Sequence, residues 1–181
     1  GAPYEDSGAL VDSGVVHVLY GSAAAASSFS LANLISQDGF SGGQDIYGGV
    51  EAGDQFGKTL AAGDFNNDGA DDLAIGSVYE DIGSIVDAGG LNVLYGTLIG
   101  LTDVNNQFFS LDQFTPGVGS LPGSAASFDH LTSSLATGDV NGDGYADLLV
   151  GISGEDFVAS GTNPAAFNAG AFILVYGSAN R

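Results

Sequence analysis

Two short stretches of the chain place oxygen-bearing side chains at the same fixed spacing. Residues 64–72 and 139–147 both follow the pattern D-x-N-x-D-G-x-x-D, with Asp at loop positions 1, 5 and 9 and Asn at position 3. Alternate side chains in such a loop point their oxygens into one concavity, and the Gly at position 6 permits the sharp turn. Hard oxygen ligands without Cys or a nearby His favour Ca²⁺ over zinc or copper. The spacing therefore predicts two Ca²⁺ loops.

The predicted ligands are the side-chain oxygens at positions 1, 3, 5 and 9 and the backbone carbonyl at position 7. They belong to Asp64, Asn66, Asp68, Ala70 and Asp72 in the first loop, and to Asp139, Asn141, Asp143, Tyr145 and Asp147 in the second. An EF-hand would carry Glu at position 12, where this chain has Ile75 and Val150, so position 9 has to supply the last carboxylate. The apolar residues that follow each loop predict a buried strand. The alternative is a polar Asx turn between strands that binds no ion.

The charge balance limits the partners that this chain can have. Its 181 residues include 22 Asp and Glu against two Lys and Arg, a formal net charge of −20. Such a surface repels nucleic acid and anionic membranes, and bound divalent cations would relieve its self-repulsion. Hydrophobic residues make up 44% of the chain, which is enough for a folded core, and no apolar run is long enough to span a membrane. Because Ca²⁺ sites of ordinary affinity fill where Ca²⁺ is abundant, we expect an extracellular or cell-surface location.

Several motifs return at a step of 75 residues, which is also the separation of the two predicted Ca²⁺ loops. A Glu-Asp pair stands at residues 5–6, 80–81 and 155–156. A Val-Leu-Tyr-Gly motif at residues 18–21 returns at 93–96, and a related motif occurs at 174–177 after an insertion near 160–168. Self-similarity at a fixed period is typical of repeat architectures, in which one supersecondary unit is used several times.

Each unit of the repeat is predicted to form four short strands. In the middle unit we expect strands at 56–63, 73–76 and 91–95, with a fourth near 108–111. Turn residues separate them, and no segment carries a convincing helical stripe of apolar residues. Strand meanders repeated at a fixed period indicate a β-propeller in which each unit is one blade. The predicted fold class is all-β, with blades of four-stranded antiparallel sheets, about two and a half of which are present.

The phase of the repeat divides the chain into three blades and two connections. We predict a partial blade at 1–31 without its innermost strand, a connection at 32–52, a complete blade at 53–111 with the first Ca²⁺ loop, a connection at 112–126, and a partial blade at 127–181 with the second loop but without an outermost strand. Partial blades leave strand edges open. We therefore expect other blades of a longer chain, or neighbouring copies of this one, to complete them, a head-to-tail contact between copies giving a filament.

At these positions the chain resembles the FG-GAP repeat family, known from the integrin α-subunit propeller and from many bacterial surface proteins. Phe56-Gly57, the loop at 64–72 and the Gly-Ala-Pro corner at residues 1–3 carry the resemblance, and Phe128-Asp129 stands in place of Phe-Gly in the last blade. The resemblance implies a propeller fold, Ca²⁺ held by the side chains of both loops, and a role in adhesion or surface architecture. A protein or glycan surface ligand is a candidate partner.

Other chemistry-bearing residues have less specific interpretations. The repeated Glu-Asp pairs carry carboxylates that could serve acid–base chemistry, but their repetition favours one of two structural interpretations, a solvated loop corner or an auxiliary cation site. His17 and His130 stand in different blades without a second His or Cys nearby, which favours strand or turn positions over metal ligation. No nucleophile elbow precedes a helix, and the Gly-rich segments lack the Lys of a phosphate loop. We predict a non-enzymatic module; the alternative is a propeller portion that accompanies a secreted hydrolase.

Overall fold

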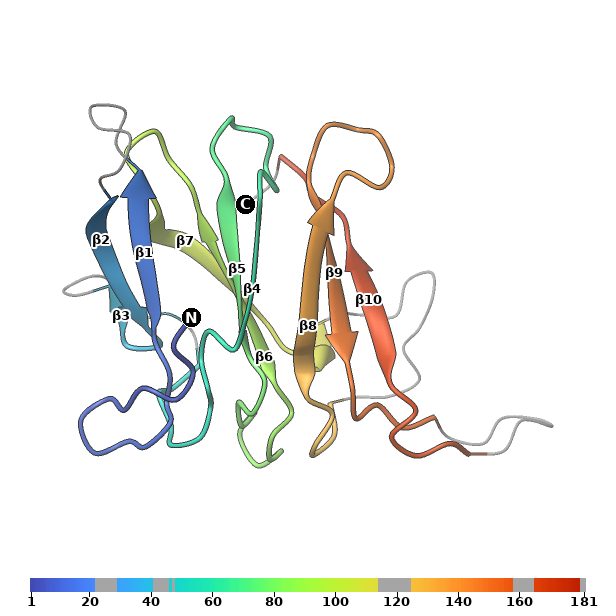
Figure 1. Cartoon of the computed structure of the whole chain (residues 1–181). Coiled ribbons are helices and arrows are strands. Elements are labelled where there is room, and N and C mark those ends of the chain that lie inside the picture. The colour runs from blue at the N-terminus through green and yellow to red at the C-terminus, as the bar shows by residue number, and fades with distance from the viewer. Residues whose placement is uncertain (22–28, 41–45, 47, 114–124, 158–164, 180–181) are drawn as a thin grey trace.

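The computed structural model contains three antiparallel β-sheets that stand side by side in the order of the chain (Figure 1). It describes residues 1–21, 29–40, 46, 48–113, 125–157 and 165–179. Each sheet is built from strands that are consecutive in sequence, so the connections within a sheet are simple hairpins. The predicted all-β fold, made of propeller blades of antiparallel sheets, is confirmed.

The middle sheet contains four strands in sequential order: β4 (Thr59–Gly63), β5 (Asp72–Ser77), β6 (Gly90–Tyr95) and β7 (Thr102–Phe109). Every residue of β6 is buried, because both faces of this strand are covered. The fourth strand was predicted near residues 108–111, which finds the strand and its last two residues but places it too far along the chain. The strand begins at Thr102 and reaches β6 through an irregular register, whereas Leu111 already starts a short 3-10 turn, η1 (Leu111–Gln113).

The two outer sheets contain three strands each. The first consists of β1 (Val16–Gly21), β2 (Phe29–Ser36) and β3 (Gly39–Phe40), and the third consists of β8 (Leu131–Gly138), β9 (Asp147–Ile152) and β10 (Ala171–Val175). By the 75-residue step, β1 corresponds to β6, whereas β8 and β9 correspond to β4 and β5. Strand β2 pairs with β1 as far as Ile35, so strand structure extends into the 32–52 stretch predicted as a connection. The predicted connection at 112–126 lies mostly outside the described residues.

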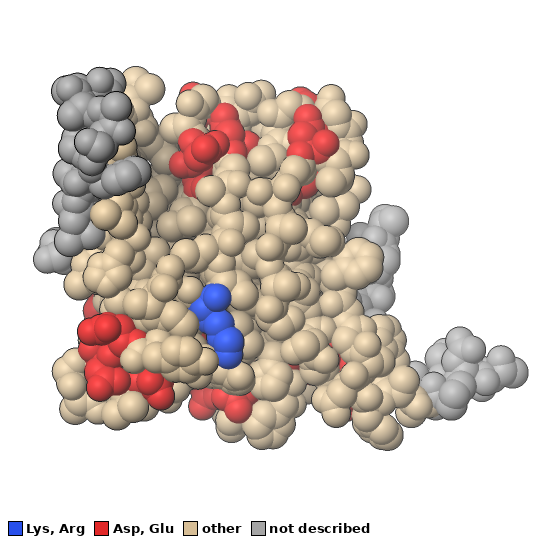
Figure 2. All heavy atoms as spheres, in the orientation of Figure 1, with Lys and Arg blue, Asp and Glu red and all other residues tan. Residues whose placement is uncertain are grey.

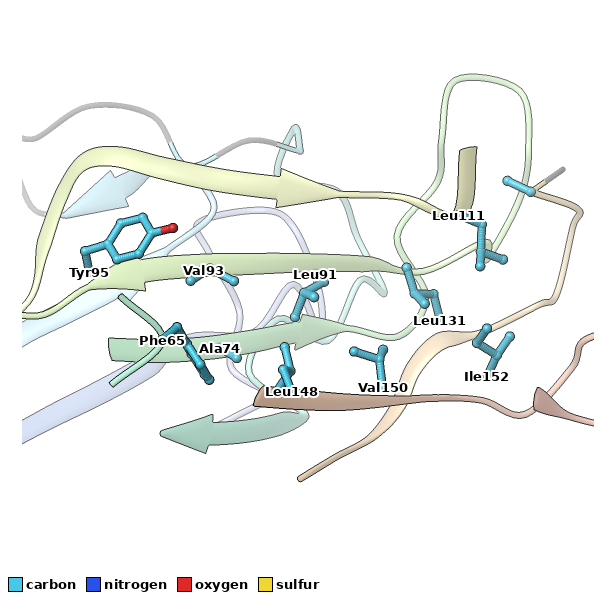
Figure 3. Packing of buried hydrophobic residues seen from close by; sticks show 11 residues of the cluster. Phe65, Ala74, Leu91, Val93, Tyr95, Leu111, Leu131, Leu148, Val150 and Ile152 are labelled. Atoms are coloured by element: carbon cyan, nitrogen blue, oxygen red, sulfur yellow. The ribbon is translucent and has the colours of Figure 1, made fainter. Parts of the chain in front are cut away.

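Apolar side chains fill two layers between neighbouring sheets. The layer between the first and middle sheets contains Val16, Ile35, Ile46, Phe56, Ile75 and Leu94. The layer between the middle and third sheets is shown in Figure 3, where Ala74, Leu91 and Val93 lie across from the side chains of β9. Burying one such aliphatic side chain stabilises the fold by roughly 1.5–3 kcal/mol. These layers are therefore the main source of attraction between blades.

A glycine meets the backbone of the next blade at each junction. A Cβ on Gly14 would lie nearer to the carbonyl oxygen of Phe56 than van der Waals contact allows, and a Cβ on Gly89 would overlap that of Leu131 in the same way. Both glycines have a φ of +85°, which a residue with a side chain rarely adopts. The same junction is thus repeated one blade later, and only glycine leaves room for it.

The structure also corrects the entrance of the third blade. Phe128-Asp129 was predicted to replace Phe-Gly, but Leu131 and Thr132 occupy the place of Phe56 and Gly57. Leu131 is fully buried as Phe56 is, while Phe128 is 54% exposed. Thr132 has the left-handed φ of Gly57, +69° against +82°. The prediction was wrong because it followed the aromatic ring, whereas an aliphatic side chain fills the same buried space.

Replacing Gly89 with Ala tests the junction. The new Cβ would clash with the Leu131 backbone and strain a left-handed residue, so we expect Gly89→Ala to lower the free energy of unfolding by about 2–4 kcal/mol. Gly83→Ala is the matched control, because Gly83 is also left-handed but has open space around its Cβ. Denaturant unfolding of both variants makes the comparison. Equal losses in the two variants would contradict a close approach at Gly89.

Candidate metal centre

The two acidic loops lie at the same edge of neighbouring sheets. One joins β4 to β5 and the other joins β8 to β9, and both project at the top of Figure 1. Figure 2 shows their acidic side chains as two separate clusters on this edge. The carboxylates of Asp68, Asp139 and Asp143 are exposed, whereas Asp72 and Asp147 at position 9 are only 1% exposed. Each loop therefore combines exposed acids with one that the fold holds in place.

The exposed carboxylates accept hydrogen bonds from the backbone of their own loop. Asp64 at position 1 accepts from Asp68 N at 3.0 Å and from Gly69 N at 2.8 Å. Asp139 accepts in the same way from Gly144 N at 3.0 Å. The position 5 carboxylates accept from the position 7 amides, Ala70 N to Asp68 at 3.0 Å and Tyr145 N to Asp143 at 2.9 Å. These bonds bend the backbone into the turn that the Gly at position 6 allows.

The position 9 aspartates join each loop to another turn of the same blade. Asp72 accepts from Phe65 N at 2.9 Å with one oxygen and from Gly96 N at 2.8 Å with the other. Asp147 repeats both bonds, from Val140 N at 2.9 Å and Gly177 N at 3.0 Å. Burial raises the pKa of Asp72, and the two amide bonds oppose that rise. Sequence reasoning predicted a ligand at this position and missed its structural role.

The position 3 residues differ between the loops. Asn66 is 7% exposed, and its Oδ1 atom is buried without a hydrogen-bond partner among the described atoms. Asn141 is exposed, and both ends of its amide contact Asp143. An unpaired buried oxygen is costly, and a cation is one way to satisfy it. In the first loop, the Oδ1 atom of Asn66 is therefore a buried acceptor that is available to a cation.

The donor set fits Ca²⁺ by its chemistry, but the side chains do not converge. Within the described residues, no group of three His, Cys, Asp or Glu side chains lies close enough together to hold a metal ion. The position 1 and position 5 carboxylates are turned to backbone amides instead. A carboxylate that accepts an N–H keeps further lone pairs, so the same oxygens remain able to bind an ion after a small rotation.

Comparison with models of known protein families identifies the repeats that contain these loops. The FG-GAP repeat model matches residues 56–92 and 131–171. These two segments are FG-GAP repeats. The two matches begin at Phe56 and Leu131, the buried residues that open their blades. This agrees with the structure, in which Leu131 is equivalent to Phe56. A search of curated proteins found no significant match.

The two FG-GAP repeats contact each other through their acidic loops. Ala146 N in the second loop donates to the carbonyl of Asp64 in the first at 2.9 Å, and Ser178 N donates to the carbonyl of Phe65 at 2.9 Å. Thr137 Oγ1 also donates to the carbonyl of Ala62 at 2.8 Å. The loops are thus neighbours joined by a backbone hydrogen bond, from Ala146 N to the carbonyl of Asp64, which no motif in the sequence indicates.

The repeated Glu-Asp pairs form loop corners next to the FG-GAP repeats. The Asp of each pair accepts from the N–H of a left-handed residue further along: Asp12 to Asp6 at 2.9 Å, Asp87 to Asp81 at 2.8 Å, and Asn168 to Asp156 at 2.6 Å. The carbonyl of each Glu accepts from the glycine that stands two residues after that left-handed residue, Gly14, Gly89 or Gly170. Of the two interpretations made from the sequence, these bonds favour a loop corner, but its Glu is solvated only in the first blade, because Glu80 and Glu155 are buried.

The Glu side chains of the second and third corners are buried beside another acid. Glu80 and Asp54 are each 2% exposed, and the equivalent Glu155 and Asp129 are 4% and 3% exposed. Burial, followed by the charge of Asp54, raises the pKa of Glu80 to about 8, although a hydrogen bond from Gln37 opposes the rise. Burial raises the pKa of Asp54 to about 6. Sequence reasoning missed these acid pairs, and the 75-residue step was the signal that could have found them.

The two histidines lie in different surroundings, one against aromatic rings and the other on an exposed strand position. The His130 ring packs edge-on against Tyr79, with ring centroids 5.2 Å apart, and also lies near Phe128. His17 lies exposed on β1. These positions favour packing and surface roles for both residues.

The raised pKa of Glu80 predicts a specific pH dependence. Below about pH 4.5 this group is protonated in the folded and unfolded chains alike. As the pH rises from 4.5 towards 8, the unfolded chain ionises while the folded chain keeps the proton, so stability falls by up to about 1.4 kcal/mol per pH unit. Glu80→Gln should flatten this fall and raise the melting temperature at pH 8.

Melting curves recorded between pH 4.5 and 8 make this measurement. Glu5→Gln is the matched control, because Glu5 holds the same corner in the first blade but is exposed. Its pH profile should follow that of the unmodified chain. If Glu80→Gln also kept the unmodified profile, the buried acid would not be the source of the dependence.

Proposed function

We propose that this chain is a non-enzymatic, Ca²⁺-stabilised part of an extracellular β-propeller with a structural or adhesive role. The observation that carries the proposal is the pair of loops with one oxygen donor set at one edge of two successive FG-GAP repeats. The proposed ligands are the side chains of positions 1, 3, 5 and 9 and the carbonyls of Ala70 and Tyr145.

The electrostatics of the loops support a cation. Each loop holds three ligand-type carboxylates, in a chain whose formal net charge is −20. Like charges this close repel one another, and a divalent ion removes that repulsion. Position 9 is already fixed by two amide bonds, so binding would have to order only the exposed part of the loop. Such a loop loses little conformational entropy when an ion binds.

The repetition of the acidic features supports a structural role over a catalytic one. The buried pair of Asp54 and Glu80 returns in the next blade as Asp129 and Glu155, and the same holds for the loops. Catalytic groups are normally assembled once, at a single site. The alternative function, a propeller portion accompanying a secreted hydrolase, would require catalytic residues outside this stretch.

Among the residues that the structure describes, no helix has the length and hydropathy needed to cross a bilayer.

The open face of the third sheet supports further blades as partners. Leu149, Phe172 and Tyr176 are 40%, 70% and 59% exposed on this face. Their counterparts in the middle sheet, Ala74, Leu91 and Tyr95, are buried by the third sheet. The first sheet likewise exposes Leu19, whereas the equivalent Leu94 is fully buried. We infer that another blade, from a longer chain or a neighbouring copy, covers these faces, and that a protein or glycan ligand binds the completed surface.

Metal binding is tested by its effect on stability. Ca²⁺ at a hundred times its dissociation constant would stabilise each folded site by about 2.7 kcal/mol. Asp68→Ala and Asp143→Ala should each lower the melting temperature in millimolar Ca²⁺ and reduce the drop caused by a chelator. Asp71→Ala is the matched control, because Asp71 is exposed at position 8, where the second loop has Ala146.

The chelator response separates the proposal from its alternative. An Asx turn without an ion would give the same melting curve with and without chelator. A control variant that loses the response as fully as Asp68→Ala would also contradict the assignment of ligands.

The open face is tested by the solution mass of this chain. The 18.0 kDa chain should associate at micromolar concentration, because its outer sheet exposes apolar side chains that a blade normally covers. Phe172→Ser with Tyr176→Ser should shift the mass measured by light scattering towards 18.0 kDa. Val86→Ser, a change at an exposed apolar loop residue, should leave it unchanged. A monodisperse monomer of the unmodified chain would argue against an adhesive face here.

A further inference from the structure

We propose that Asn141 is a self-modifying residue: the loop at 139–147 promotes the deamidation of Asn141 to aspartate or isoaspartate. The same position of the first loop, Asn66, is built in a way that resists this reaction. The proposal concerns the covalent chemistry of the chain and does not depend on a bound metal.

The neighbouring residue makes the reaction sterically open. Asn141 is exposed and is followed by Gly142, which has no side chain to hinder attack of its backbone nitrogen on the Asn141 Cγ atom. In the first loop the following residue is Asn67, whose Cβ crowds the same approach. The two loops therefore differ at the one position that most affects ring closure.

Three hydrogen bonds around Asn141 match the needs of the reaction. Gly142 N donates to Asp139 Oδ1 at 2.7 Å, which places a carboxylate to accept the proton of the attacking nitrogen. Asp143 N donates to Asn141 Oδ1 at 2.9 Å, where negative charge develops on the amide oxygen. Asn141 Nδ2 donates to Asp143 Oδ2 at 2.8 Å, which holds the leaving nitrogen in place; because Asn141 is exposed, solvent water carries to Nδ2 the proton that Asp139 takes from Gly142 N. Base, oxyanion donor and leaving-group contact are thus present together.

Asn66 lacks this arrangement. It is 7% exposed, and its Oδ1 atom has no hydrogen-bond donor among the described atoms, so charge on that oxygen would be unsupported. Its Nδ2 atom contacts Asp72 Oδ1 at 3.5 Å, a carboxylate already held by two backbone amides. Burial also restricts the rotation that would bring its Cγ to the next nitrogen.

The covalent balance is simple. The Gly142 nitrogen loses its proton and forms a bond to Cγ of Asn141, the Cγ–Nδ2 bond breaks, and the nitrogen leaves as ammonia after gaining that proton. Water then opens the succinimide ring. Opening at one carbonyl gives an aspartyl residue with a normal backbone, and opening at the other gives an isoaspartyl link. Water is consumed, ammonia is released and no redox partner is needed.

The two products would change the loop in different ways, one in its charge and the other in its backbone. Aspartate at position 3 adds a carboxylate to the three that the loop already has, and isoaspartate lengthens the backbone by one methylene and displaces the loop. Any effect of these two products on metal affinity rests on the proposed function, because it requires that the loop binds a metal ion. The two loops of one chain would then diverge with age, the second changing while the first stays as synthesised.

The test is incubation of the full chain at mildly alkaline pH with chelator, below its melting temperature, followed by peptide mass mapping. Asn141 should convert, with both aspartyl and isoaspartyl products, while Asn66 stays intact. A synthetic peptide of residues 136–150 is incubated in parallel. Because a positioned base typically contributes 10²–10⁴-fold, the folded chain should react at least roughly tenfold faster than the peptide. Conversion at the peptide rate or slower would overturn the proposal.

Variants separate the sequence from the geometry. Gly142→Asn copies the first loop, whose Asn67 already adopts a positive φ of 55°, and should leave Asn141 intact without unfolding the chain. Asp139→Asn should slow the reaction although Gly142 remains. Asn67→Gly places a glycine after Asn66, which should still resist because it is buried. If Asn66 in that variant deamidated as fast as Asn141, the Asn-Gly dipeptide alone would control the reaction, and the proposed role of the loop geometry would be overturned. Chelator keeps all arms independent of the Ca²⁺ proposal.

Discussion

Apolar packing between facing sheets is the interaction on which the rest of this structure depends. One antiparallel sheet cannot bury both of its faces, so each blade is stable only against its neighbours. The two layers of aliphatic side chains supply the attraction, and the contacts of Gly14 and Gly89 set how closely the sheets approach. The acidic loops lie at one edge because this packing aligns β4 with β8 and brings equivalent turns together.

The same packing explains how a chain so rich in acids can bury several of them. Asp72 and Asp147 are buried where two backbone amides compensate each carboxylate. Glu80 and Asp54 have less compensation, and their pKa values rise because burial disfavours the charged form. Some buried acids therefore join turns through backbone amides, while Glu80, with a pKa of about 8, keeps its proton at neutral pH.

Much of the fold could be predicted from the sequence, because the 75-residue step aligns hydrophobic strands, glycines and acidic loops in one register. The start of β7 could not be predicted, since Thr102–Asn106 is polar and exposed enough to look like a turn. Leu131 was missed because the Phe-Gly motif was sought by residue type, although the 75-residue step from Phe56 leads directly to Leu131. The loop residues were found from spacing alone. The acid pair of Glu80 and Asp54 was not, because the sequence does not show that these acids are buried, although the 75-residue step leads from them to Glu155 and Asp129.

The bond from Ala146 N to the carbonyl of Asp64 has a consequence for how the two loops respond to anything that binds them. Asp64 opens one loop, and Ala146 precedes the buried Asp147 of the other, so a shift of either backbone would have to strain or break this hydrogen bond. Thermodynamic linkage makes such an influence reciprocal: whatever factor one loop imposes on affinity at the other is returned unchanged. In a propeller that repeats this bond from blade to blade, the loops would form a cooperative ring rather than a set of independent sites.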